Sequence, residues 1–401
     1  MYNYDQSFYS CALQFAPHNK PMMHFAKMVA KMAAEKAAAG EKVEPSPFAG
    51  NTMAYGASFG CVPTGEGSLL FQMLTVPGAK VEVGGMRGTA VYDLGKVEMK
   101  EVEPGFYQGE AHGWAPGFQY IEFTVNGVPT MNDRAPIGYG YSKAVNFCEV
   151  PGSEEEMNVY MLKDVPHGSV HMEVYFSKTT GMWRNCVVYT PPGYDPVNCK
   201  YPTLYLQHGG GEDETGWLWQ GKINYICDNL LAEGKIEPML VVMNAGYAFR
   251  ADEEYDFVPG DLGKVLRDDC IPMIESKYAV YTDREHRAMA GLSMGSYQTQ
   301  VAVADYPELF AYEGILSGTV AERMAEIDKD MNFADVDKAN EMKLIFISCG
   351  TSEERCMGQM AFIDELKARG IKNIVTYTSP GVHEWRVWRS AAADFLPRLF
   401  R

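Results

Sequence analysis

The 401-residue sequence lacks the features of several specialised classes of protein. It has no apolar run of the roughly 20 residues that a membrane-spanning helix needs. Residues Met1 to Pro17 contain no basic segment followed by an apolar stretch. We therefore expect no signal peptide and a cytoplasmic protein. A chain whose leader had been removed would look the same, so export stays open.

Positive charge is scarce. The sequence has 35 Lys and Arg against 52 Asp and Glu, which gives a formal net charge of −17. A surface of this sign repels phosphate groups and anionic lipids, so nucleic acid and membrane are not expected as partners.

Paired cysteines are also missing. The nine cysteines contain no C-x-x-C pair, and the eight histidines are dispersed, so no metal site and no cofactor are expected. Several cysteines lie in apolar runs, where a thiol behaves as a small apolar side chain. We expect reduced thiols at Cys186, Cys227, Cys270 and Cys349.

The length predicts more than one domain. Residues 1–60 read as a helical and extended segment, with a helix over Pro21–Ala39 whose apolar residues recur at helical spacing. We favour packing of this helix on the body of the protein. A lid over the active site and a dimer contact are the alternatives, which leaves a homodimer open.

Residues 61–155 are predicted to form a β-sandwich. From about Gly67 to Gly152 the chain has short extended runs separated by turns, one of which is Asn126-Gly127, a strong hairpin signal. The stretches 117–128 and 132–136 resemble the end of the immunoglobulin-like early-set modules that are related to glycogen-binding domains. The resemblance implies carbohydrate binding. Because Trp114 is the module's one tryptophan, we favour a structural or pocket-shaping role.

Residues 165–401 alternate strands with helices, which predicts an α/β fold with a mostly parallel sheet covered on both faces. Function is then expected at the carboxyl ends of the strands. The predicted strands are His171–Phe176, Asn185–Tyr189, Thr203–His208, Met239–Asn244, Ala288–Leu292, Tyr312–Leu316, Leu344–Cys349 and Ile374–Thr378. The predicted helices are Tyr225–Glu233, Asp261–Lys277, a helix from about Ser296 to Asp305, Met357–Arg369 and Trp385–Phe400.

The stretch Gly291-Leu292-Ser293-Met294-Gly295 follows one of these strands and precedes a helix. About one chain in ten of this length contains Gly-x-Ser-x-Gly by chance, so the strand-turn-helix context carries the argument. In that context the serine occupies a sharp, strained turn that exposes its hydroxyl at the sheet edge. Ser293 is therefore the candidate nucleophile.

His383 and an acid complete the set. His383 follows the last predicted strand, and Glu353 and Glu354 follow the strand Leu344–Cys349. The chain order Ser, acid, His is that of α/β-hydrolases, where histidine removes the serine proton and the carboxylate orients the histidine. Glu353 is preferred, and Glu354 remains the alternative.

An oxyanion hole needs two backbone donors. The N–H of Met294 begins the helix after the serine, and the glycine-rich loop His208-Gly209-Gly210-Gly211 follows a buried strand. We expect the N–H groups of Met294 and Gly210 to hold an oxyanion.

At four places the sequence resembles the feruloyl esterase branch of the esterase D family: residues 208–217, 228–235, 281–295 and 383–388. In that family an aspartate follows Cys-Gly-Thr-x, a position that falls on Glu353 here. The resemblance implies a serine esterase that releases hydroxycinnamates from plant-polysaccharide fragments. Aromatic residues near the predicted pocket suit a flat phenolic acyl group. The candidate substrate contacts are Trp217, Trp219, Trp385 and Tyr247.

Three alternatives stay open. Siderophore esterases of the enterochelin type also join an N-terminal β-module to this catalytic fold, and acetyl-carbohydrate esterases share its chemistry. A carbohydrate-binding protein with an inactive hydrolase body is the third. In each case the partner is a small-molecule or oligosaccharide ester or its carbohydrate part.

Overall fold

The computed structural model describes residues 60–86, 95–253, 260–318, 333, 335–354 and 363–401, together with 32, 35, 36 and 38–41. The chain divides into two compact units. One comprises residues up to Gly138 and Ala144–Leu162, and the other comprises Tyr139–Lys143 and Lys163–Arg401. The predicted helix Pro21–Ala39 and the start of the predicted helix Met357–Arg369 lie mainly or wholly outside the described residues.

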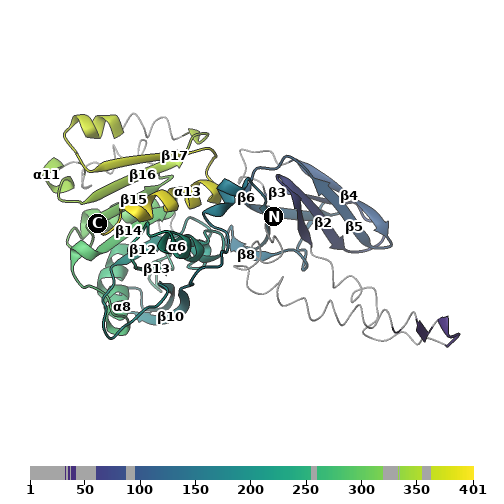
Figure 1. The fold of residues 1–401 in the computed structure, drawn as a ribbon, viewed down its shortest axis with the longest axis horizontal. Helices are drawn as coiled ribbons and strands as arrows, with labels where there is room; N and C mark the ends of the chain where they lie inside the picture. Colours follow the sequence, from purple (N-terminus) through teal and green to yellow (C-terminus); the bar gives the residue numbers. More distant parts are fainter. Residues whose placement is uncertain are drawn as a thin grey trace. The chain divides into compact units, whose positions relative to one another are not determined.

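The first unit is antiparallel throughout its described strands. They follow the order β1-β2-β5-β4-β3-β6-β9-β8, with β7 paired to β6, in one curled sheet (Figure 1). This antiparallel, sandwich-like unit agrees with the β-module that the turn spacing predicts. The strand bounds are β1 Cys61–Gly65, β2 Ser68–Leu74, β3 Val81–Gly85, β4 Lys96–Glu103, β5 Phe106–Ala111, β6 Gly117–Val125, β7 Val128–Thr130, β8 Ile137–Gly140 and β9 Lys143–Val150.

Trp114 belongs to the core of this unit. It is 5% exposed, and its ring centroid lies 5.3 Å from that of Phe71. A ring enclosed in this way cannot stack on a sugar, so Trp114 has the structural role favoured from the sequence. The short helix α4, Glu154–Asn158, closes the unit and begins with a capping box between Ser153 and Glu156.

The second unit contains an eight-stranded sheet in the order β10-β11-β13-β12-β14-β15-β16-β17 (Figure 1). Pairing is antiparallel from β10 to β13 and parallel from β13 onward. The predicted α/β-hydrolase sheet is therefore confirmed. The strands are β10 Ser169–Ser177, β11 Met182–Thr190, β12 Thr203–Gln207, β13 Leu240–Asn244, β14 Arg287–Leu292, β15 Tyr312–Leu316, β16 Leu344–Gly350 and β17 Ile374–Ser379.

Helices cover both faces of this sheet. Ala302 and Val303 of α9 share a core with Met289 and Ile315, whereas Phe395 of α13 packs on Gly314, whose position faces the opposite way. The helical segments are α5 Gly216–Trp219, α6 Ile223–Ala232, α7 Leu262–Val265, the π-helical turn η2 Leu266–Cys270, α8 Ile271–Lys277, the 3₁₀ turn η3 Arg284–His286, α9 Met294–Asp305, α11 Val336–Ala339, α13 Trp385–Phe395 and the 3₁₀ turn η4 Leu396–Arg398.

Three of the predicted helices need correction. The run Asp261–Lys277 is interrupted by η2, whose Asp269 accepts hydrogen bonds from the Ser177 hydroxyl and the Lys178 and Thr179 amides. The helix after the nucleophile begins at Met294 rather than near Ser296. The last α-helix ends at Phe395, because Pro397 removes a backbone donor.

The cysteine prediction is wrong at one position. Cys186, Cys227 and Cys270 are buried free thiols, as expected. Cys349 is instead disulfide-bonded. Periodicity showed that Cys349 is buried but not which residue lies next to it.

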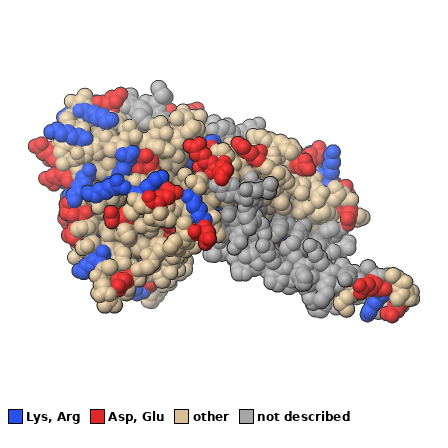
Figure 2. All heavy atoms as spheres, viewed as in Figure 1, with Lys and Arg blue, Asp and Glu red and all other residues tan. Residues whose placement is uncertain are grey.

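Acidic and basic side chains are interspersed over the second unit in the view of Figure 2, so the negative net charge does not form a single-signed face there. Within the described residues, no helix has the length and apolar character needed to span a membrane.

A buried carboxyl group lies in the middle of the second unit's sheet. Glu313 is 1% exposed and pairs in register with Met289 and Ile345 on the neighbouring strands. No described group bonds its Oε2 atom. Burial raises the pKa of Glu313 from 4.5 to about 8, so between these pH values this side chain is neutral whereas a surface glutamate is charged.

We expect this group to make the protein less stable at alkaline pH. The folded-state pKa of about 8 lies above the unfolded value of 4.5, so the free energy of unfolding falls as pH rises between them. Glu313→Gln should remove this dependence and should gain a few kcal/mol relative to wild type between pH 5 and pH 9. Denaturant titrations at several pH values measure it, with the exposed Glu341→Gln as control. Parallel pH profiles for wild type and Glu313→Gln would contradict the assignment.

Candidate active site

Ser293 stands at the turn between β14 and α9. Its backbone has φ 51° and ψ −115°, a strained conformation for a residue with a side chain. Its N–H donates to the Leu316 carbonyl at 3.0 Å, and its own carbonyl accepts from the Ser296 hydroxyl at 2.6 Å. The strained turn is therefore held from both sides, which leaves the half-buried side chain at the carboxyl edge of the sheet.

The two glycines beside Ser293 are needed for close packing. A Cβ on Gly291 would lie 2.3 Å from the Gly295 backbone, and one on Gly295 would lie 2.5 Å from the His208 carbonyl oxygen. Neither glycine has a positive φ, so room rather than backbone freedom decides their identity. The contact also presses the turn against the loop that follows β12.

His383 contacts the preferred acid. Its Nδ1 lies 3.2 Å from Oε2 of Glu353, while Oε1 of Glu353 accepts from the Ser317 hydroxyl at 2.6 Å and the Gly350 amide at 2.8 Å. Burial acts to raise the pKa of Glu353, but these hydrogen bonds outweigh it and hold the pKa below its usual value. Glu353 is thus ionised, and its contact orients the imidazole.

The alternative acid points elsewhere. Glu354 is exposed, whereas Glu353 is 8% exposed. The carboxylate of Glu353 therefore faces the histidine, and Glu354 faces solvent. Ser293, Glu353 and His383 follow β14, β16 and β17, whose carboxyl ends share one edge of the parallel sheet.

The backbone N–H groups of the glycine-rich loop differ in whether the protein supplies them with an acceptor. Gly209 N–H donates to Glu212 at 3.2 Å, and Gly211 N–H donates to the Tyr247 hydroxyl at 2.5 Å. Among the described residues, no group accepts from the N–H of Gly210 or of Met294. Gly210 is exposed, so its amide is open to a ligand.

The buried His208 side chain holds this loop in place through two hydrogen bonds. It is 1% exposed, its Nε2 accepts from the Gly246 N–H at 2.8 Å, and its Nδ1 lies 2.8 Å from the Gly209 carbonyl. Because Nε2 is an acceptor, the proton is on Nδ1 and donates to that carbonyl. Burial lowers the pKa of His208, which keeps the ring neutral.

The structure corrects two of the four predicted substrate contacts. Trp217 and Trp385 are 1% and 2% exposed, and their indole N–H groups donate to Gln207 and Glu212. Their rings pack edge to face at 5.2 Å. They are core residues that contact each other, so neither ring is accessible to a substrate. Trp219 and Tyr247 are half-buried and remain candidates.

Glu212 is a site residue that sequence reasoning missed. Its Oε2 accepts from the Gly209 amide, and its Oε1 accepts from the Trp385 indole at 2.9 Å. Trp385 in turn packs on Trp388, whose ring lies against His383 at 5.0 Å. This buried carboxylate therefore ties the glycine loop to the histidine segment. Its place directly after His208–Gly211 was the available signal.

Residues Tyr139–Lys143 also belong to this unit. Ser142 N–H donates to the Gly211 carbonyl at 2.8 Å, and Tyr141 and Ser142 have φ values of 54° and 59°. Burial, with Glu212 nearby, raises the pKa of Tyr141 to about 12. Their position far upstream in the chain gave no sign of this contact.

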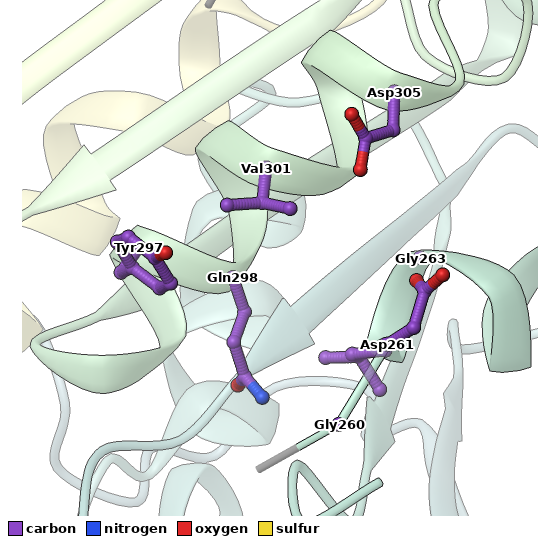
Figure 3. Close-up of a pocket in the computed structure, with 8 residues that line it drawn as sticks. Gly260, Asp261, Gly263, Tyr297, Gln298, Val301 and Asp305 are labelled. Atoms are coloured by element: carbon purple, nitrogen blue, oxygen red, sulfur yellow. The ribbon is translucent and has the colours of Figure 1, made fainter. Parts of the chain in front are cut away.

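A pocket of about 290 Å³ runs along α9. Figure 3 shows Tyr297, Gln298, Val301 and Asp305 projecting from that helix, opposite the segment Gly260–Gly263. Tyr297 N–H donates to the Ser293 carbonyl, so one end of the pocket is a single helical turn from the serine. In the part of the chain that the structure describes, no three His, Cys, Asp or Glu residues gather as a metal site.

Comparisons with known proteins place the chain in a family. The sequence profile of the family described as "Putative esterase" matches residues 177–399, which is more than half of the chain. The chain belongs to this esterase family. It is 34% identical over 327 residues to an endo-1,4-beta-xylanase/feruloyl esterase of Xylanibacter ruminicola, a match that covers 80% of this chain and 42% of that relative. The chain thus spans less than half the length of this relative.

Solved structures share the fold. A ferulic acid esterase from Anaeromyces mucronatus, solved with ferulic acid, has a TM-score of 0.51 at 23% identity and covers 61% of this chain and 95% of its own. The enterobactin esterase of Shigella flexneri has a TM-score of 0.56 at 14% identity and covers 86% of this chain and 97% of its own. At these identities the likeness is one of fold. The second structure extends it over much of both units.

The contacts of Glu353 predict that Glu353→Gln lowers kcat for a small ester by at least about a hundredfold, since a neutral amide no longer stabilises the imidazolium. Glu354→Gln is the matched control and should stay within about twofold of wild type, because its side chain is in solvent. Steady-state kinetics measure both. Equal losses in the two variants would remove Glu353 from the site.

The contacts of Glu212 predict that Glu212→Gln and Trp385→Phe each lower kcat by about tenfold or more with little change in KM. Both changes break the same tie between the glycine loop and the histidine segment, so the double variant should lose less than the product of the single effects. Kinetics and thermal unfolding of all three separate activity from folding. The exposed ion-pair variant Glu233→Gln is the control, and additive losses would contradict a shared tie.

Proposed function

We propose that this chain is a serine esterase that releases ferulate or a related hydroxycinnamate from plant-polysaccharide fragments through an acyl-enzyme. The observation that carries the proposal is the ionised, buried Glu353 in contact with His383, at the sheet edge where the strained Ser293 turn presents its hydroxyl. Membership of the esterase family supports the reaction class.

In this mechanism the Ser293 hydroxyl attacks the ester carbonyl while His383 accepts its proton. Glu353 stabilises the resulting imidazolium through Nδ1. The N–H groups of Met294 and Gly210, which lack acceptors in the described part of the chain, hold the oxyanion. His383 then gives the proton to the leaving alcohol, and water releases the acid by the reverse steps.

The hydroxycinnamate substrate is supported by the feruloyl esterase named in the Xylanibacter relative and by the ferulic acid bound to the Anaeromyces neighbour. The half-buried Trp219 and Tyr247 are the remaining candidates for contact with a flat phenolic ring. The Tyr247 hydroxyl accepts from Gly211 N–H, so its ring sits beside the proposed oxyanion loop.

A panel of four esters tests the proposal: methyl ferulate, methyl p-coumarate, p-nitrophenyl acetate and a catecholate siderophore trilactone. We expect kcat/KM to be highest for the two hydroxycinnamates, and Ser293→Ala to lower kcat on every turned-over ester by about a thousandfold or more.

Each outcome of the panel has a distinct meaning. Preference for the trilactone would replace the substrate by that of the enterobactin esterase neighbour. Preference for acetate would indicate an acetyl esterase. No turnover of any ester, or full activity in Ser293→Ala with an intact fold by circular dichroism, would refute the assignment of the nucleophile.

A further inference from the structure

The edge strand of the second unit's sheet carries an exposed apolar face. Its large apolar side chains are 38–61% exposed on β10, and Trp183 on β11 is 72% exposed. We call this set the β10 stripe; it consists of Val170, Met172, Val174, Phe176 and Trp183. Soluble proteins rarely leave such a contiguous apolar patch uncovered, so the stripe needs a physical explanation.

The stripe is contiguous because of strand geometry. Side chains alternate across a strand, so the four β10 residues share one face. Phe176 pairs in register with Trp183, and their ring centroids are 5.6 Å apart. On the same face of β11, Val187 and Tyr189, which pair with Met172 and Val170, are completely buried. The stripe is therefore the uncovered margin of an apolar layer that is covered elsewhere.

The strand cannot easily fold away to hide these residues. β10 and β11 pair over nine consecutive positions, and the hairpin end is held by the hydrogen bonds of Ser177, Lys178 and Thr179 to Asp269. The surface is thus preformed, which lowers the entropic cost of binding a partner.

The strand also lacks the devices that protect sheet edges. It stands first in the strand order of its sheet, and its sequence SVHMEVYFS has no proline. Its one carboxylate, Glu173, lies on the opposite face, where it contacts Lys277 and the Tyr278 hydroxyl. An apolar face of this kind is suited to packing against a second apolar face.

We propose that the β10 stripe is the contact between two copies of this chain, related by a two-fold axis. An axis lying between the two stripes packs the apolar face of one copy on the same face of the other, with no need for complementary charges. The exposed area of the five residues is on the order of 500 Å². Two copies therefore bury on the order of 1,000 Å² from these side chains alone, which reaches the size of a specific interface.

Sedimentation velocity on the full chain over a wide concentration range tests the proposal. Wild type should sediment as a dimer of the 44.6 kDa chain. Val174→Glu puts an unpaired charge into the contact and should weaken dimerisation by more than about tenfold. Val197→Glu is the matched control, because Val197 is also an exposed valine, at 86%, but lies outside the stripe. It should leave the dimer unchanged.

Two results of this experiment would overturn the proposed dimer. A monomeric wild type at the highest concentration overturns the proposal, including the case in which another part of the same chain covers the stripe. A dimer that Val174→Glu leaves intact overturns it too. Circular dichroism checks the fold of each variant, and Met172→Lys provides a second charged substitution at an exposed site should Val174→Glu fail to fold. Turnover of a small ester should be equal in all variants.

Discussion

Three stretches of backbone pack against one another without side chains at the centre of the site. Gly291 approaches Gly295, and Gly295 approaches the carbonyl groups of Gln207 and His208. This contact holds β14, the first turn of α9 and the end of β12 at fixed separations. The strain at Ser293 persists because the surrounding packing determines the turn from several sides. This packing fixes the position of the serine relative to the glycine loop.

Two buried carboxylates organise what surrounds this contact. Glu353 gathers hydrogen bonds from three directions, and each of its donors comes from a different strand end. Glu212 accepts hydrogen bonds from the Gly209 amide and from the indole of Trp385, in the helix that follows His383. A buried charge is costly unless it is fully bonded, so each carboxylate defines the positions of its donors as much as the donors stabilise it.

The second unit has two distinct surface features. One is the hydrogen-bonded polar site at the carboxyl edge of the sheet, and the other is the exposed apolar stripe along β10. Both are preformed, but they serve different kinds of recognition. Directed N–H groups and an oriented imidazole suit a small polar centre in a substrate. A flat row of apolar side chains has no directional groups and suits another surface of the same character.

Local patterns determined much of this protein from sequence alone. Strand and helix periodicity, the Gly-x-Ser-x-Gly turn and the order of Ser293, Glu353 and His383 predicted the α/β sheet and the residues at its carboxyl edge, because these depend on neighbours in the chain. The tertiary structure decided which glutamate faces His383 and that Trp217 and Trp385 are enclosed in the core. It also revealed the roles of Glu212, Ser317 and the Tyr141–Ser142 turn, and the disulfide at Cys349. The physical reason is that burial and side-chain pairing arise between segments far apart in the chain, and spacing along a sequence does not record which of them meet.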